Sequence, residues 1–288
     1  MDRNNYADCF WGYPTSKANF CEADYAISRY IGEFINSLSN VIYVVYGIYG
    51  LHQLRQKGNK NGDPLRTLSY WGLIAVGVCS VVFHVSLKYH TQMMDDLSMH
   101  FATTPVLHRV LTVNSTHRDS LVIGTVLGAL LAFLLTFHMM TDELIVHSAS
   151  FVSTVTVIGV QTIRLVNTRT QPGSISRLQM WGIVRFGAVI FNVGYWFWLA
   201  DQWACGFFTK ARDAIGLPWA FVLELHGWWH ICTGIGAYIF IAVVDLLVSG
   251  EDMADPRQSV AWPASWAATS IFAGRGPSVE AGVRGKQA

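Results

Sequence analysis

Long apolar runs separated by short polar stretches dominate the chain from about residue 34 to residue 248. A helix needs about 20 mostly apolar residues to cross the hydrocarbon core of a bilayer, where every backbone polar group must be paired within the segment. The pattern therefore predicts an all-α integral membrane bundle of seven transmembrane helices. The predicted spans are residues 34–54, 68–88, 96–113, 120–140, 144–163, 179–200 and 218–248.

Two polar flanks border this region. Residues 1–33 lack a short apolar core behind a basic start, so no cleavable signal peptide is expected and the first span itself directs insertion. Residues 249–288 carry scattered charge with Gly, Ser and Pro, a composition typical of disorder. The predicted organisation is an N-terminal segment at 1–33, a membrane domain at 34–248 and a disordered tail at 249–288.

The basic residues of the short connections indicate the orientation of the bundle, because Lys and Arg are retained on the cytoplasmic side. They gather in the first, third and fifth connections, while acidic residues prevail on the opposite side. We therefore expect a lumenal N-terminus and a cytosolic tail. The cytosolic set is Arg55, Lys57, Lys60, Arg66, Arg118, Arg164, Arg169 and Arg177.

Composition supports the membrane assignment and excludes other classes. Hydrophobic residues make up 52% of the chain and charged residues only 14%, against about a quarter charged in soluble domains. The net charge of +1 provides no basic field for nucleic acid, and no Gly-rich phosphate loop is present. Nucleic acid and nucleotides are therefore not expected partners.

The predicted topology sorts the five cysteines. Cys79 and Cys232 fall within spans, whereas Cys9, Cys21 and Cys205 fall on the lumenal side, where disulfides form. A bridge between Cys21 and Cys205 would clip the N-terminal segment to the sixth connection. Spacing alone leaves the pairing open.

A few polar residues interrupt the apolar runs, where they are costly unless they are paired or bound. Ser80 and His84 are four residues apart, as are His226 and His230, so each pair shares one helix face. The topology sets both pairs at a similar lumenal depth, with Asp95 where the third span begins. We therefore expect these groups to meet.

Three neutral imidazoles and one open position form a common catalytic zinc site, in which the metal lowers the pKa of water to about 7. Asp95 or its neighbour Asp96 could take the proton and return it to a leaving nitrogen. Ser80 could donate a hydrogen bond to a developing oxyanion. The predicted chemistry is metal-assisted hydrolysis inside the bilayer, with a lipid as substrate.

Two other interpretations fit the same residues. Histidines in membrane helices often serve only as interhelical hydrogen-bond partners, and paired histidines can bind haem as axial ligands of an electron carrier. The spacing of His226 and His230 on one helix face fits a single ion better than a haem slot. Five further histidines are interpreted as packing or interfacial residues, namely His90, His100, His108, His138 and His147.

Before the first span, Glu22, Asp24 and Glu33 cluster with Asn19 and Asn36. Oxygen donors at short spacing suit a hard cation such as calcium. A solvated acidic segment is the alternative, since no EF-hand pattern is present.

Several separate motifs, in order, resemble the alkaline ceramidases, a family of seven-span intramembrane zinc amidohydrolases. The opening Trp11 to Ser16 and Phe20 to Tyr25 are similar to that family's first motif, and His226-Gly227-Trp228-Trp229-His230 is similar to its last. The resemblance covers about residues 9–248. The remaining matching stretches are 33–40, 80–95 and 201–205.

The resemblance implies zinc ligation by His84, His226 and His230, proton handling by Asp95 rather than Asp96, and oxyanion support from Ser80. It also implies a disulfide between Cys21 and Cys205, and a calcium site whose ligands match Asn19, the backbone carbonyl of Phe20, Glu22, Asp24 and Glu33. The family usually has Asp where this chain has Asn19, and Asn where it has Asp24. The number of acidic residues is therefore unchanged, but one of them lies at a different position.

The function implied is hydrolysis of the amide bond of ceramide, or of its dihydro or phyto forms, to a sphingoid base and a fatty acid, in the endoplasmic reticulum or Golgi. A calcium ion would brace the N-terminal segment over the site. The alternative is a non-catalytic seven-helix receptor, similar to the adiponectin and progestin receptors, in which zinc is structural.

Overall fold

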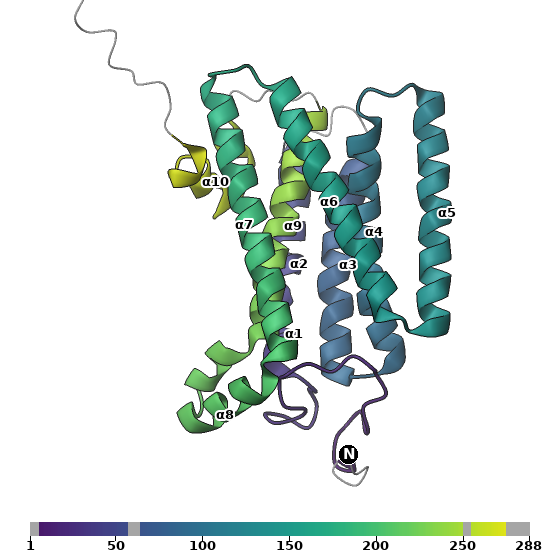
Figure 1. Ribbon diagram of the computed structural model, residues 1–288, viewed down its shortest axis with the longest axis vertical. Coiled ribbons are helices and arrows are strands. Elements are labelled where there is room, and N and C mark those ends of the chain that lie inside the picture. The colour runs from purple at the N-terminus through teal and green to yellow at the C-terminus, as the bar shows by residue number, and fades with distance from the viewer. Residues whose placement is uncertain (1–5, 57–63, 250–254, 275–288) are drawn as a thin grey trace, which may run out of the picture.

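The computed structural model describes residues 6–56, 64–249 and 255–274, and all regular elements there are helical apart from one isolated bridge between Ser28 and Ile31. The all-α prediction is confirmed. The long helices stand side by side, with the N-terminal segment and the short helix α8 (Cys205–Ile215) at one end (Figure 1). They are α2 (Val41–Gln56), which follows the short α1 (Phe34–Ser39), α3 (Pro64–Ser86), α4 (Tyr89–Thr112), α5 (His117–Thr141), α6 (Leu144–Arg169), α7 (Ile175–Trp203) and α9 (Leu225–Ser249).

Six helices in the described part of the chain are long and apolar enough to cross a membrane. The predicted third span belongs to α4, which is 24 residues long but is not among the six. Asp95, Asp96 and Arg109 lower its apolar character. Nevertheless α4 packs along α3 within the bundle (Figure 1). The six qualifying segments are Phe34–Gln56, Pro64–Ser86, His117–Thr141, Leu144–Arg169, Ile175–Trp203 and Leu225–Ser249.

Two helix boundaries differ from the prediction in ways that matter for the site. Helix α4 begins at Tyr89 rather than at residue 96, so Asp95 lies in its second turn, within the bundle. Helix α9 begins at Leu225 rather than at residue 218, and Gly216, with a positive φ of 72°, ends α8 before it. A short 3-10 helix, Trp219–Leu223, fills the interval. Both histidines of α9 therefore lie in its first two turns.

The core of the bundle is centred on α9, which is apolar on all sides and correspondingly buried. Its main neighbours are α7 and α2. A glycine on α7, Gly194, allows this close approach, since a Cβ there would lie 2.9 Å from the Cβ of Cys232. By contrast, His138 is the one buried residue of α5, whose apolar side chains otherwise face outward. An outward apolar face suits contact with lipid.

Far from the histidines, a buried ionic cluster joins α3, α4 and α9. Arg66 donates two hydrogen bonds of 2.8 Å to the Asp245 carboxylate, and Arg109 Nη2 lies 3.0 Å from Asp245 Oδ1. All three side chains are at most 7% exposed. Removing one member of such a cluster leaves a buried charge without its counter-ion.

Asp245→Asn is accordingly expected to destabilise the fold by about 3–5 kcal/mol, since the arginines would lose their carboxylate. Thermal unfolding of the detergent-purified protein measures this. Asp213→Asn, at an exposed position on α8, is the matched control and should leave the melting temperature unchanged. Equal melting temperatures for both variants would contradict the account.

The tail differs from the predicted disorder wherever the structure describes it. Residues 255–274 pack on the bundle through Ala264 and Ala267, both fully buried, in the short helix α10 (Ala264–Ala267). Tyr46 Oη donates to the Trp262 carbonyl at 2.8 Å. Small alanines allow close packing that a reading of overall composition misses. The rest of the predicted tail, residues 250–254 and 275–288, lies outside the described residues, as do residues 1–5, Lys57 and Lys60.

Candidate active site

Three buried histidines meet where α3 ends and α9 begins. His84 lies in the last turn of α3, and His226 and His230 share one face of α9. Each has an imidazole nitrogen within 4.8 Å of the others, and none is more than 3% exposed. In the part of the chain that the structure describes, this is the one group of His, Cys, Asp and Glu side chains whose ligand atoms converge in this way.

Neighbouring polar groups orient two of these rings. Glu33 Oε2 lies 2.5 Å from His84 Nδ1, and Ser39 Oγ lies 2.8 Å from His230 Nδ1. A carboxylate on the outer nitrogen fixes the orientation of a metal-ligating imidazole and raises its basicity. His84 Nε2 and His226 Nδ1 are buried without a hydrogen-bond partner. Neutral imidazole nitrogens of this kind are among the ligands that zinc binds.

Ser80 and Asp95 form a hydrogen-bonded pair one helical turn from His84. Ser80 is one helical turn before His84 on α3, and its Oγ donates to Asp95 Oδ2 of α4 at 3.2 Å. Asp96 faces the other way, with its Oδ2 3.1 Å from His138 Nε2 on α5. The two adjacent aspartates therefore contact different helices, Asp95 contacting α3 and Asp96 contacting α5. Of the two, Asp95 is the one hydrogen-bonded to Ser80 of α3.

Among the residues that the structure describes, the acidic side chains before the first span do not form a comparable cluster of converging oxygen atoms. Glu22 accepts hydrogen bonds from the backbone N–H groups of Ile35 and Asn36 at 2.7 and 2.8 Å, so it caps α1. Asp24 accepts one from Tyr6 Oη at 3.1 Å. Asn19 is exposed. The predicted calcium ligands are therefore mostly occupied by protein donors in this structure.

Two of those carboxylates are nevertheless poorly compensated. Burial raises the pKa of Glu22 to about 7 and that of Glu33 to about 8. Glu33 Oε1 is buried without a hydrogen-bond partner. The ring of Phe20 does not point toward them but stacks on His226, with centroids 3.6 Å apart. Phe20 thus covers the histidine cluster.

The N-terminal segment is fixed over this end of the bundle by covalent and polar contacts. A disulfide joins Cys21 to Cys205 at the start of α8, and Arg212 Nη2 donates to the Cys21 carbonyl at 2.6 Å. Asp201 Oδ2 accepts from the Cys21 N–H at 3.0 Å. Cys9, Cys79 and Cys232 are free thiols. The segment therefore forms a cover over the three histidines.

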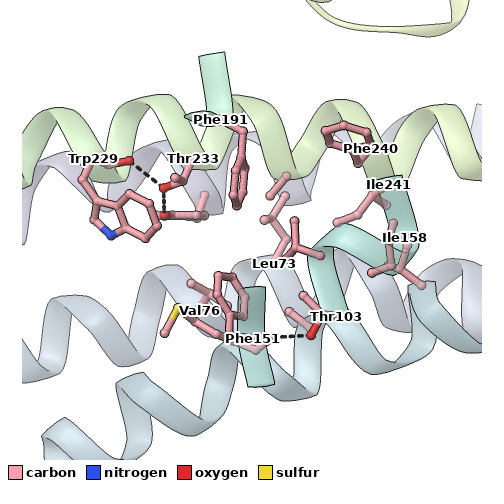
Figure 2. A pocket seen from close by; sticks show the side chains of 16 residues that line it. Leu73, Val76, Thr103, Phe151, Ile158, Phe191, Trp229, Thr233, Phe240 and Ile241 are labelled. Atoms are coloured by element: carbon pink, nitrogen blue, oxygen red, sulfur yellow. Dashed lines mark hydrogen bonds between the residues drawn. The ribbon is translucent and has the colours of Figure 1, made fainter. Parts of the chain in front are cut away.

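An apolar cavity of about 80 Å³ lies next to the histidines, toward the middle of the bundle. Figure 2 shows Trp229 and Thr233 of α9 on one wall, opposite Leu73 and Val76 of α3. Tyr43 also lines this cavity. Its hydroxyl is hydrogen-bonded to the Thr233 hydroxyl at 2.6 Å, and its ring centroid lies 6.5 Å from that of His230. The arrangement can bind an apolar chain close to the histidines.

The roles of three residues in this site, and the cavity beside it, were not predicted from the sequence. Ser39 and the neighbouring Asn40, whose Nδ2 lies 3.2 Å from His230 Nδ1, were not singled out. Glu33 was assigned only to calcium, although it contacts His84. The signal for all three was their position in one polar stretch, 33–40, at the start of an apolar run. The cavity has no local signal, because its walls come from six helices.

The chain was compared with known proteins. The ceramidase family matches residues 12–272. Alkaline ceramidase YPC1 of Saccharomyces cerevisiae is 29% identical over 250 residues, which cover 82% of this chain and 78% of the yeast protein. Alkaline ceramidase 3 of Mus musculus is 27% identical over 245 residues, with 84% and 85% covered. The family match spans most of the chain, including the three histidines and the docked part of the tail, and the protein therefore belongs to the ceramidase family.

Proposed function

We propose that this protein hydrolyses the amide bond of ceramide, or of its dihydro or phyto forms, to a sphingoid base and a fatty acid. The observation that carries the proposal is the convergence of three buried imidazoles next to both the Ser80 and Asp95 pair and an apolar cavity. The names of the relatives support ceramide as the substrate.

We propose that His84, His226 and His230 hold a zinc ion through one imidazole nitrogen each. When bound, zinc polarises an amide carbonyl and lowers the pKa of water to about 7. Glu33 and Ser39 keep the His84 and His230 rings in position. Glu33 and Ser39 would thereby hold the ligand nitrogens of the three histidines close together in a buried site.

Asp95 is the proposed proton carrier. Water adds its oxygen to the acyl carbon, and Asp95 accepts the proton that the water loses. The C–N bond then breaks as Asp95 delivers this proton to the leaving nitrogen. Ser80 holds Asp95 through its hydrogen bond and can turn its hydroxyl hydrogen toward the oxyanion that develops on the acyl oxygen.

A ceramide carries two long apolar chains and a small polar head. The cavity next to His230 would take one chain, while the head and its amide lie at the histidines. Phe20, stacked on His226, would close the polar end against bulk water. Excluding water in this way strengthens the electrostatic interactions at the reacting amide.

The membrane arrangement proposed with this function has seven spans, namely the six qualifying segments and α4. Its acidic residues are tolerated because they face neighbouring helices, Asp95 toward α3 and Asp96 toward α5. The N-terminus and the histidines would be lumenal and the tail cytosolic, in the endoplasmic reticulum or Golgi. The lumenal disulfide between Cys21 and Cys205 agrees with this orientation.

Calcium binding stays a prediction from the family resemblance. Glu33 Oε1, which is buried without a hydrogen-bond partner, favours a cation close by. The hydrogen bonds that Glu22 accepts from α1 argue against Glu22 as a calcium ligand in the present conformation. No catalytic step depends on this ion.

The test is a panel of ceramide, dihydroceramide and phytoceramide given to the purified protein, with zinc content measured on the same sample. We expect about one zinc ion at the three histidines and release of sphingoid base from at least one substrate. Folded, zinc-loaded protein that hydrolyses none of them, at neutral or alkaline pH and with or without calcium, would favour the receptor alternative.

A further inference from the structure

We propose that a second transition-metal site lies on the opposite side of α4, between α4, α5 and α6. Its residues are His100, His138 and His147, one from each helix, and none is more than 7% exposed. The His147 ring lies between the other two, with centroid distances of 4.9 Å to His100 and 4.7 Å to His138. The packing of apolar helices does not require three imidazoles from three helices to lie together.

Hydrogen bonding leaves free nitrogens in this cluster. An ionised carboxylate only accepts hydrogen bonds, so His138 Nε2, 3.1 Å from Asp96 Oδ2, carries the hydrogen. In the neutral ring Nδ1 then presents a lone pair, and this atom is buried without a hydrogen-bond partner. His147 Nδ1 is buried without one as well. Two lone nitrogens in an apolar environment call for a bound species.

A small cavity lies among these residues. Its volume is about 10 Å³, and its walls include the three histidines, Ser150, Phe137 and Val146. That space holds one ion or one water molecule. The Asp96 carboxylate on the outer nitrogen of His138 repeats the relation between Glu33 and His84 at the first site. Such a carboxylate contact is typical of histidines that bind metal.

The donor chemistry selects the class of ion. Neutral imidazoles bind zinc, copper, nickel or cobalt, whereas calcium and magnesium require oxygen ligands. The nitrogens of this cluster do not yet converge as those of His84, His226 and His230 do. A bound ion would require the His100 and His147 rings to turn while His138 keeps its contact with Asp96. This second site is independent of the function proposed above.

Zinc stoichiometry tests the proposal. Tag-free protein is stripped of metal with a chelator, reloaded with zinc and freed of excess, and zinc per chain is measured. We expect about two zinc ions in the unsubstituted protein and about one in His138→Ala and in His147→Ala. His226→Ala should also retain about one, and the His147→Ala, His226→Ala double variant should retain none.

The matched control is His108→Gln, which removes a histidine that also bridges α4 and α5, through a 3.0 Å contact to the Ser120 carbonyl. It should keep both ions. Loading with cobalt gives a second readout, because each occupied site adds visible absorption. The second site would be overturned, and the first left intact, if the unsubstituted protein holds one ion that is lost in His226→Ala and kept in His147→Ala. Because the unsubstituted protein decides this count, misfolding of a variant leaves the test valid.

Discussion

His230→Ala is expected to lower the rate of ceramide hydrolysis by more than about 100-fold, since loss of residues that merely support a metal ligand already costs 10–100-fold. The ring of His230 is one of three whose nitrogens converge, and alanine supplies no ligand atom in its place. Release of sphingoid base by the purified variant, together with its zinc content, measures the effect.

The matched control is His52→Ala, which removes an exposed histidine from α2. It should retain full activity and zinc. Thermal unfolding of both variants separates loss of the site from loss of the fold. Near-normal hydrolysis by folded His230→Ala would contradict the assignment of this histidine as a zinc ligand.

Asp95→Asn should lower kcat by about 10²–10⁴-fold, the usual contribution of a positioned acid or base. Asparagine keeps the shape of the side chain and an oxygen for the Ser80 hydrogen bond, but it cannot carry the proton. Zinc content should stay unchanged, because Asp95 is not one of the converging ligands. Single-turnover kinetics with ceramide isolate the chemical step.

Asp96→Asn provides the comparison within the same helical turn. Its carboxylate contacts His138 and faces away from Ser80, so its substitution should cost much less activity than that of Asp95. Equal losses from the two variants would mean that Asp95 acts through the fold of α4 rather than through proton transfer.

The apolar pattern was sufficient to predict the helical bundle and to bring the histidines together. The four-residue spacings of Ser80 with His84 and of His226 with His230 defined helix faces, and topology supplied the shared depth. The structure agrees in both respects, because the last turn of α3 meets the first turns of α9. Periodicity is a local property, so it can be read from one sequence.

What the sequence could not provide depends on contacts between distant segments. Glu33 contacts His84 across 51 positions, and Tyr43 contacts Thr233 across 190. From the sequence, His138 and His147 are interpreted as packing or interfacial residues. Their grouping with His100 emerges only when three helices are assembled. The docked tail was missed for the same reason.

Hydrolysis in water enriched in oxygen-18 tests the central claim most directly. If zinc-activated water attacks the amide, the fatty acid released by zinc-loaded protein should carry one labelled oxygen in its carboxylate, and zinc-free protein should release almost none. The His226→Ala variant should behave like the zinc-free protein. Folded, zinc-loaded protein that releases no labelled fatty acid from any ceramide would contradict the account.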